Sequence, residues 1–280
     1  MIASNGNPAS KFLVGLMRGL AGALLFALPM LMTMEMWQLG LYASPSRLLL
    51  LCVLAGPLLY GLARRIGFER NVSRSQALRD AVIAYALGMV VSACVLWMFG
   101  LLDETLNFGH NIAMTAFQSV PAGIGALLGR SQLGVHSGAD EEQDNDYDGE
   151  SGYFNELFMM LAGALFMGLN VAPTEEMILI GYKVAPAQTF MIVVTSLMIM
   201  HCFVYSIHFR GGHSAPEGKP AWHMFVRFTL PGYVLSFLTS VYALWTFERL
   251  DHTSWEQMIT ASVILTLPAA IGAASARLVL

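Results

Sequence analysis

The stretch Asn170-Val171-Ala172-Pro173-Thr174-Glu175-Glu176-Met177 places a proline and two carboxylates inside an apolar segment that extends from Leu157 to Tyr182. A carboxylate near the hydrocarbon of a bilayer costs roughly 2.5–3.5 kcal/mol on insertion scales, so acids at such positions usually serve a function. Pro173 lacks a backbone N–H and interrupts the hydrogen bonding of a helix. The stretch therefore predicts a broken membrane helix with acidic groups at its break.

This acidic element occurs twice in the chain. An offset of 141 residues aligns the sequence from Leu20 to Pro45 with that from Leu161 to Pro186, and eleven of the 26 residues are identical. Three identical pairs lie in the acidic element itself: Thr33 and Thr174, Glu35 and Glu176, Met36 and Met177. An offset of 148 gives further matches between residues 79–105 and 227–253, and an offset of 147 between residues 121–126 and 268–273. The sequence therefore predicts a tandem duplication.

The composition is that of an integral membrane protein. Hydrophobic residues make up 56% of the 280 residues and charged residues only 12%, whereas about a quarter of a soluble domain is charged. The mean hydropathy is +0.58, and the apolar runs are long enough for about eight transmembrane helices. We expect an all-α polytopic fold of two four-helix repeats. Because each repeat has an even number of spans, the repeats should be parallel.

The predicted organisation has three parts: a first membrane repeat over residues 1–130, a disordered acidic linker over 131–152 and a second repeat over 153–280. The first span, Phe12 to about Leu39, is expected to be continuous with a kink at Pro29. The other spans are expected near residues 48–66, 81–102, 112–128, 157–182, 189–209, 225–247 and 259–276.

The basic residues predict the topology. When the predicted spans are followed in order, twelve of the 15 Lys and Arg residues fall on the side of the N-terminus. Positive residues accumulate in cytoplasmic loops, so both termini are expected in the cytoplasm. The basic loop from Arg64 to Arg79 indicates contact with the lipid bilayer, with no nucleic acid as a partner.

The candidate functional residues come from the acidic element of each copy. A break in a membrane helix leaves backbone groups unpaired and is tolerated only where it is buried in protein or lines a wet cavity. Free carbonyls and carboxylates suit a hard cation or a proton. We expect an ion site with Glu35 and Glu176 as its metal-ligating pair, although hydrated acids in the outer headgroup region are the alternative. The full candidate set is Glu35, Glu175, Glu176, Thr33, Thr174 and Asn170.

Secondary candidates lie near the same side of the membrane. Lys183 either pairs with one of the glutamates or extends to the outer headgroups. Asp103 and Asp251 recur at the outer ends of the third and seventh spans, where a helix-terminal acid is ordinary interface anatomy. His201 is expected to be a polar core residue that hydrogen-bonds to a neighbouring helix, and no cofactor is predicted beyond a bound cation.

Several of these features together resemble a family of bacterial integral membrane proteins with no assigned activity. They are the eight-span pattern, the Pro-Thr-Glu-Glu element at 173–176, the Leu-Asp pairs at 102–103 and 250–251, and the acidic linker. The similarity covers nearly the whole chain. It implies a multi-pass architecture in the bacterial inner membrane and no catalytic residues.

Two functions remain open from the sequence. The first is a cation-conducting channel or transporter, in which the paired glutamates hold an inorganic cation or a proton; a homodimer would bring four such acids around one pore. The second is a non-transport membrane module, either a scaffold or regulator that acts through its linker, or a lipid-handling enzyme. The first reading does not require an enzymatic reaction.

Overall fold

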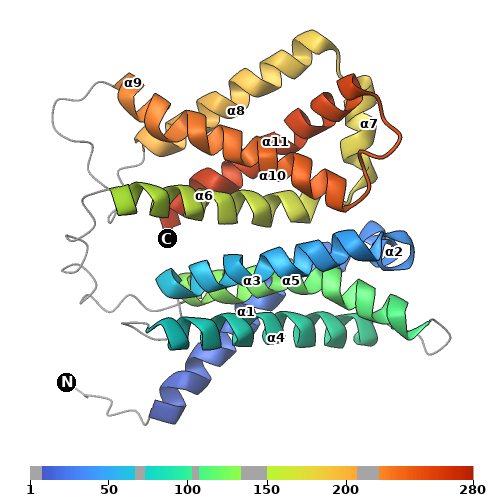
Figure 1. Cartoon of the computed structure of the whole chain (residues 1–280), viewed down its shortest axis with the longest axis vertical. Helices are drawn as coiled ribbons and strands as arrows, with labels where there is room; N and C mark the ends of the chain where they lie inside the picture. The colour runs from blue at the N-terminus through green and yellow to red at the C-terminus, as the bar shows by residue number, and fades with distance from the viewer. Residues whose placement is uncertain (1–7, 67–72, 103–106, 134–149, 207–220, 280) are drawn as a thin grey trace. The chain divides into compact units, whose positions relative to one another are not determined.

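The computed structural model describes residues 8–66, 73–102, 107–133, 150–206 and 221–279, which are helical apart from short turns (Figure 1). Eight of the helices are long and apolar enough to cross a membrane. The all-α fold class and the predicted number of spans are therefore confirmed. The chain divides into two compact units, residues 1–135 and 136–280.

The first unit begins with a helix that breaks. α1 (Pro8–Leu31) ends two residues before the nine-residue α2 (Met34–Tyr42). Three long helices complete the unit: α3 (Pro45–Ile66), α4 (Arg74–Met98) and α5 (Phe108–Leu133). Pro45 opens α3, where a missing N–H costs nothing, and Ser73 starts α4 with a capping box.

The second unit repeats this order of elements. α6 (Glu150–Val171) is followed by the nine-residue α7 (Glu175–Lys183), then by α8 (Pro186–Ser206). The short α9 (Ala221–Met224) and a π-helical turn, η1 (Phe225–Thr229), lead into α10 (Leu230–Thr246), and α11 (Trp255–Val279) ends the unit. α7 and α8 begin 141 residues after α2 and α3, as the sequence repeat predicts. The parallel arrangement of the two repeats stays a prediction.

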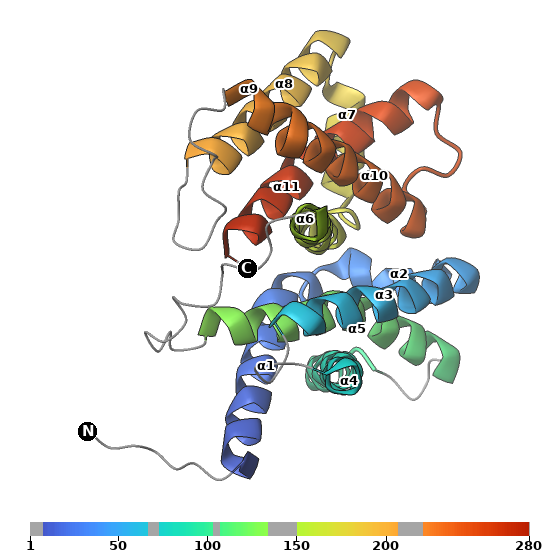
Figure 2. The same ribbon diagram turned by 60° about the vertical axis from the view of Figure 1, so that its left-hand side comes forward.

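The last long helix of each unit is its central element. In the first unit, α1, α2, α3 and α4 all pack on α5, which lies among them in both views (Figures 1 and 2). In the second unit, α6, α7, α8 and α10 pack on α11 in the same way. Most positions along the central helices are buried, which accounts for the small side chains along them.

Glycines permit the closest helix crossing in each unit. A Cβ at Gly22 of α1 would lie 2.5 Å from both the Gly125 carbonyl oxygen and the Gly129 Cα of α5. The counterpart in the second unit is equally tight, because a Cβ at Gly163 of α6 would collide with Gly272 and Ala276 of α11. Small residues at such crossings let two backbones approach closely in a membrane.

Two expectations about the elements are wrong. The first span is not one kinked helix, because α1 continues through Pro29 and the chain breaks at Met32 and Thr33 instead. The linker is shorter than residues 131–152, because α5 extends to Leu133 and α6 begins at Glu150. Residues 134–149 of the predicted linker lie outside the described residues.

Candidate functional site at the two helix breaks

Both breaks are closed by the same threonine bond. In the first unit the Thr33 hydroxyl donates to the Met30 carbonyl at 2.8 Å, and in the second unit the Thr174 hydroxyl donates to the Val171 carbonyl at 2.9 Å. Each threonine stands at the N-cap of the following short helix, yet its hydroxyl does not cap that helix. The threonine therefore terminates the preceding helix and leaves the first turn of the next helix for other groups.

A second donor supports each break, and here the units differ. The indole N–H of Trp37 donates to the Leu31 carbonyl at 2.7 Å in the first unit. In the second unit the Arg249 guanidinium, from the loop between α10 and α11, donates to the Pro173 carbonyl. These carbonyls already accept hydrogen bonds from the chain. The oxygen atoms of the acidic and threonine side chains are therefore candidate cation ligands beside the free carbonyls expected from the sequence, which stay a prediction.

The break of the first unit lies within the length of α5 and not at its end. Two contacts fix the register: Gly22 of α1 meets Gly125 and Gly129, and Gly40 of α2 meets Met114. The segment between Gly22 and Gly40 therefore passes over the α5 residues between 114 and 125. Position 118 is ten residues from the start of α5 at Phe108, which at 1.5 Å per residue is about 15 Å from that end of the helix.

The same register holds in the second unit. Gly163 of α6 meets Gly272, and Gly181 of α7 meets Ala261, which are the counterparts of the first-unit contacts at an offset of 141 on one helix and 147 on the other. Short helices that begin at this depth make α1 with α2, and α6 with α7, discontinuous membrane helices. In transporters, such helices place their broken ends at a substrate or ion site.

The acids occupy the first turn of the short helices. Glu35 lies in the first turn of α2 and is half-buried, whereas Glu175 and Glu176 lie in the first turn of α7 and are exposed. Negative side chains are stabilised at a helix N-terminus by its dipole. Exposed carboxylates at this depth also need water or a cation, because hydrocarbon cannot solvate them.

Gln118 is a polar residue at the first break that sequence reasoning missed. Its side chain is fully buried, and neither its Oε1 nor its Nε2 has a hydrogen-bond partner among the described residues. On a helix of 3.6 residues per turn it shares one narrow stripe with Met114, Gly125 and Gly129, the α5 residues that contact α2 and α1. Gln118 therefore faces the broken helix between those two contacts.

The second unit has no glutamine at this position. An offset of 147 aligns Gln118 with Leu265, which is fully buried on the equivalent stripe of α11. Likewise, an offset of 148 aligns Arg249 with Leu101. Comparison of the two copies residue by residue was the signal in the sequence that could have identified Gln118 and Arg249.

Of the secondary candidates, Lys183 and Asp251 fall within the described residues. Lys183 is exposed at the last turn of α7, opposite the end that carries Glu175 and Glu176, and within the described residues it forms no ion pair with either. This position favours the headgroup alternative over pairing. Asp251 is half-buried in the loop after α10, and Asp103 lies outside the described residues. Asn170 donates from its side-chain amide to the Phe166 carbonyl at 2.7 Å on its own helix.

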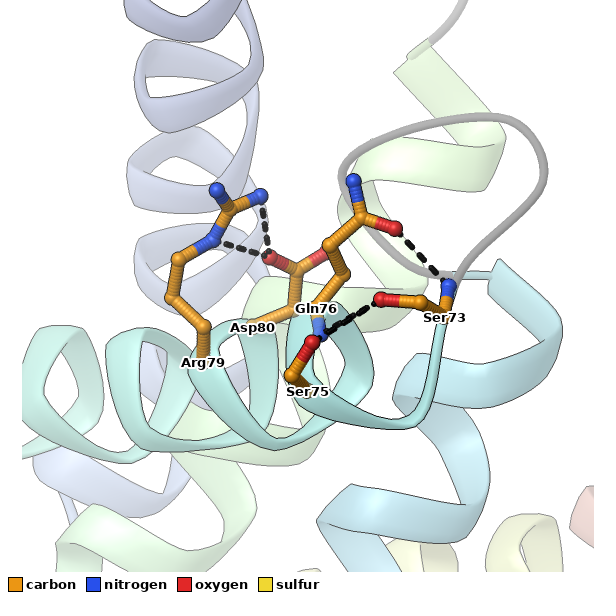
Figure 3. A network of polar contacts seen from close by, with 5 residues as sticks. All are labelled: Ser73, Ser75, Gln76, Arg79 and Asp80. Atoms are coloured by element: carbon orange, nitrogen blue, oxygen red, sulfur yellow. Dashed lines mark hydrogen bonds and ion pairs between the residues drawn. The ribbon is translucent and has the colours of Figure 1, made fainter.

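A second buried acid lies at the other end of the first unit. Ser73 and Gln76 form the capping box of α4 (Figure 3), and one turn further on the Asp80 carboxylate is fully buried. Arg79 donates from Nε and Nη2 to Asp80 Oδ1, both at 3.3 Å. The Arg79 guanidinium also lies 6.0 Å from the Phe12 ring centre, and its counterpart Arg227 lies 5.2 Å from that of Tyr153. The first of these cation–π contacts joins α1 to α4, and the second joins α6 to η1.

Other features of the second unit contribute no reactive cluster. His201 Nδ1 lies 3.0 Å from Thr229 Oγ1 on η1, which confirms His201 as a residue bonded to a neighbouring helix. An open groove of about 270 Å³ is lined by Tyr233, Val234, Phe237 and Val263, all without charge. Over the described part of the chain, no three His, Cys, Asp or Glu side chains converge as metal ligands would.

Comparison with known proteins gives one match. The model of a family described as "Putative integral membrane protein (DUF2391)" matches residues 15–280 of this chain. No curated protein and no solved structure matches it. Nearly the whole length of the chain is covered, from the fourth residue of the first predicted span to the C-terminal residue, and eight apolar helices support the same class. The chain therefore belongs to this family of integral membrane proteins.

Proposed function

We propose that this membrane protein conducts a cation or a proton, as a channel or a transporter, and that the glutamates at the two helix breaks form its site. One observation carries the proposal. Each unit interrupts a membrane helix well inside the span and restarts it with an acid in the first turn, Glu35 in α2 and Glu175 with Glu176 in α7. Broken helices and acids at such a depth are both costly in lipid.

A structural role alone would not require the acids. The hydroxyls of Thr33 and Thr174 and the donors Trp37 and Arg249 already satisfy carbonyls at the two breaks. The carboxylates of Glu35 and Glu176 are free to attract a cation, and acidic rings are a common selectivity element of cation channels. We further propose that both termini are cytoplasmic, that the membrane is the bacterial inner membrane and that a homodimer would double the number of acids around a pore.

The direct test is cation and proton flux into liposomes that contain the purified protein. The wild-type protein should carry a flux above that of empty liposomes. The flux through the Glu35→Gln, Glu176→Gln double variant should be at least tenfold lower than the wild-type flux. Glutamine keeps the size of the side chain and removes only the charge. Glu256→Gln is the matched control, because Glu256 is an exposed acid in the first turn of α11, away from either break.

Two outcomes would refute the proposal. One is the absence of any flux of Na⁺, K⁺, Ca²⁺ or protons from liposomes in which the protein is folded and correctly inserted. The other is a double variant that conducts as well as the Glu256→Gln control, because the acids would then be dispensable.

Lipid handling is the second candidate. The groove lined by Tyr233, Val234, Phe237 and Val263 is apolar and suits an acyl chain, but the one hydroxyl among these four side chains, that of Tyr233, has no acid or base in the lining to activate it. The groove therefore favours contact with lipid over a reaction on lipid. Wild-type protein that releases a product from phospholipid vesicles would favour the enzymatic reading instead.

A further inference from the structure

We propose that the two breaks are not equivalent: the first unit holds a metal cation between Gln118 Oε1 and the Glu35 carboxylate, whereas the second unit holds the Arg249 guanidinium in its place. This inference rests on the proposed function and deepens it, because it assigns the bound ion to one unit. The experiment below separates its failure from failure of the proposed function.

The first argument is the unpaired amide of Gln118. Burial of a polar group without a partner is unfavourable, so both ends of this amide require a ligand or water. The stripe that Gln118 shares with Met114 and Gly125 points its side chain at the segment between α1 and α2. Glu35 follows that segment in the first turn of α2, one turn before Leu39 and Gly40, and Gly40 packs on Met114 of α5.

The ligand chemistry is that of a hard cation. Gln118 contributes an amide oxygen, Glu35 a carboxylate and Thr33 a hydroxyl oxygen that keeps its lone pairs while its proton is donated to Met30. Hard cations such as Na⁺, Ca²⁺ and Mg²⁺ take oxygen ligands of these kinds. The half-buried position of Glu35 reduces competition from water, whereas Glu175 and Glu176 are exposed.

The second argument is what the other unit does at the same place. Arg249 reaches the broken backbone of α6 and α7 and donates to the Pro173 carbonyl, so this break has a cation built into the chain. The first unit has Leu101 at the position of Arg249, and the second unit has Leu265 at the position of Gln118. At these two positions the first unit thus has the amide of Gln118 and no arginine, whereas the second unit has the guanidinium of Arg249 and no amide.

The test is cation-dependent thermal unfolding of the full chain in detergent. NaCl, KCl, CaCl₂ and MgCl₂ are compared with choline chloride at equal ionic strength, and at least one metal cation should raise the Tm of the wild-type protein. Gln118→Leu, which copies Leu265, should abolish that rise while the Tm in choline stays the same or increases. A second variant, Leu101→Arg, should also abolish the rise, because its guanidinium would occupy the site.

Gln257→Leu is the matched control, since Gln257 is a glutamine of the second unit whose Nε2 is also buried and has no hydrogen-bond partner within the described ranges. It should leave the cation-dependent rise intact. The proposal is overturned if no metal cation raises the wild-type Tm, as expected if a water molecule satisfies Gln118, or if the rise persists in Gln118→Leu. Flux without a cation-dependent rise would refute this site alone, and a rise without flux would refute the proposed function alone.

Discussion

Replacement of Gly22 by alanine tests the helix crossing that sets the level of the first break. The added Cβ would lie 2.5 Å from the Gly125 carbonyl oxygen and from the Gly129 Cα, and both atoms belong to backbone that cannot rotate away. α1 and α5 would have to separate by about 1 Å to restore ordinary contact distances near 3.5 Å. That movement would also draw the broken segment away from Gln118.

The magnitude follows from a comparison with a second glycine. Gly56 of α3 is exposed, and a Cβ there would meet nothing within 4 Å. Alanine is the better helix former by about 1 kcal/mol at either position, so this gain cancels when the two variants are compared. The remaining difference is the cost of overpacking, about 1–3 kcal/mol. Gly22→Ala should be less stable than Gly56→Ala by that amount.

The assay is the free energy of unfolding of each variant, obtained by denaturant titration in mixed micelles. Gly163→Ala, at the equivalent crossing of the second unit, should be destabilised by a similar amount because Gly272 and Ala276 leave no space for a Cβ. Equal stability of Gly22→Ala and Gly56→Ala would show that α1 and α5 are not in contact at this point, and the register that places Gln118 at the break would be wrong.

Further predictions concern Arg249 and the two positions of positive φ just after α4 and α10. Arg249→Leu should lower the free energy of unfolding by about 1.5–3 kcal/mol, because the Pro173 carbonyl loses a charged donor, and an unchanged Tm in detergent would contradict the bond. Glu248 has a φ of 59°, whereas Gly100, 148 residues earlier, has a φ of 70° at the same position of its helix end. A positive φ is unfavourable for a residue with a Cβ and costs glycine little. Glu248→Gly should therefore raise the Tm and Gly100→Ala should lower it, each by the equivalent of about 1 kcal/mol. Changes of the opposite sign would show that the positive φ does not strain these positions.

The sequence was sufficient for the number of spans and for one of the two breaks. Pro173 and two adjacent acids inside an apolar run predict the break between α6 and α7 from local chemistry alone. The break between α1 and α2 was missed because a kink was expected at Pro29 instead. Met32, which aligns with Pro173 of the second copy, gave no sign of a break. Thr33, the partner of Thr174 in the repeat, was the better indicator, since its hydroxyl closes the break.

The remaining site residues depend on contacts between distant segments. Arg249 is 76 residues from Pro173 in sequence, and nothing near either residue indicates that they meet. Gln118 is a single amide in an apolar span, and the sequence does not indicate its role. The contacts of α1 with α5 show which face of α5 carries it. Asp80 follows Arg79 in a basic region and was not singled out, although its carboxylate proves to be fully buried.

The central position of α5 has a consequence for biosynthesis. The four helices that pack on α5 all precede it in the chain, so they leave the ribosome before their common partner exists. Until α5 is inserted, the interrupted backbone at Met32 and Thr33 lacks its protein cover and must find water, lipid headgroups or an insertion factor. The first unit can pack fully only when synthesis has passed about Leu133, and the second unit repeats this delay because α6, α7, α8 and α10 all precede α11.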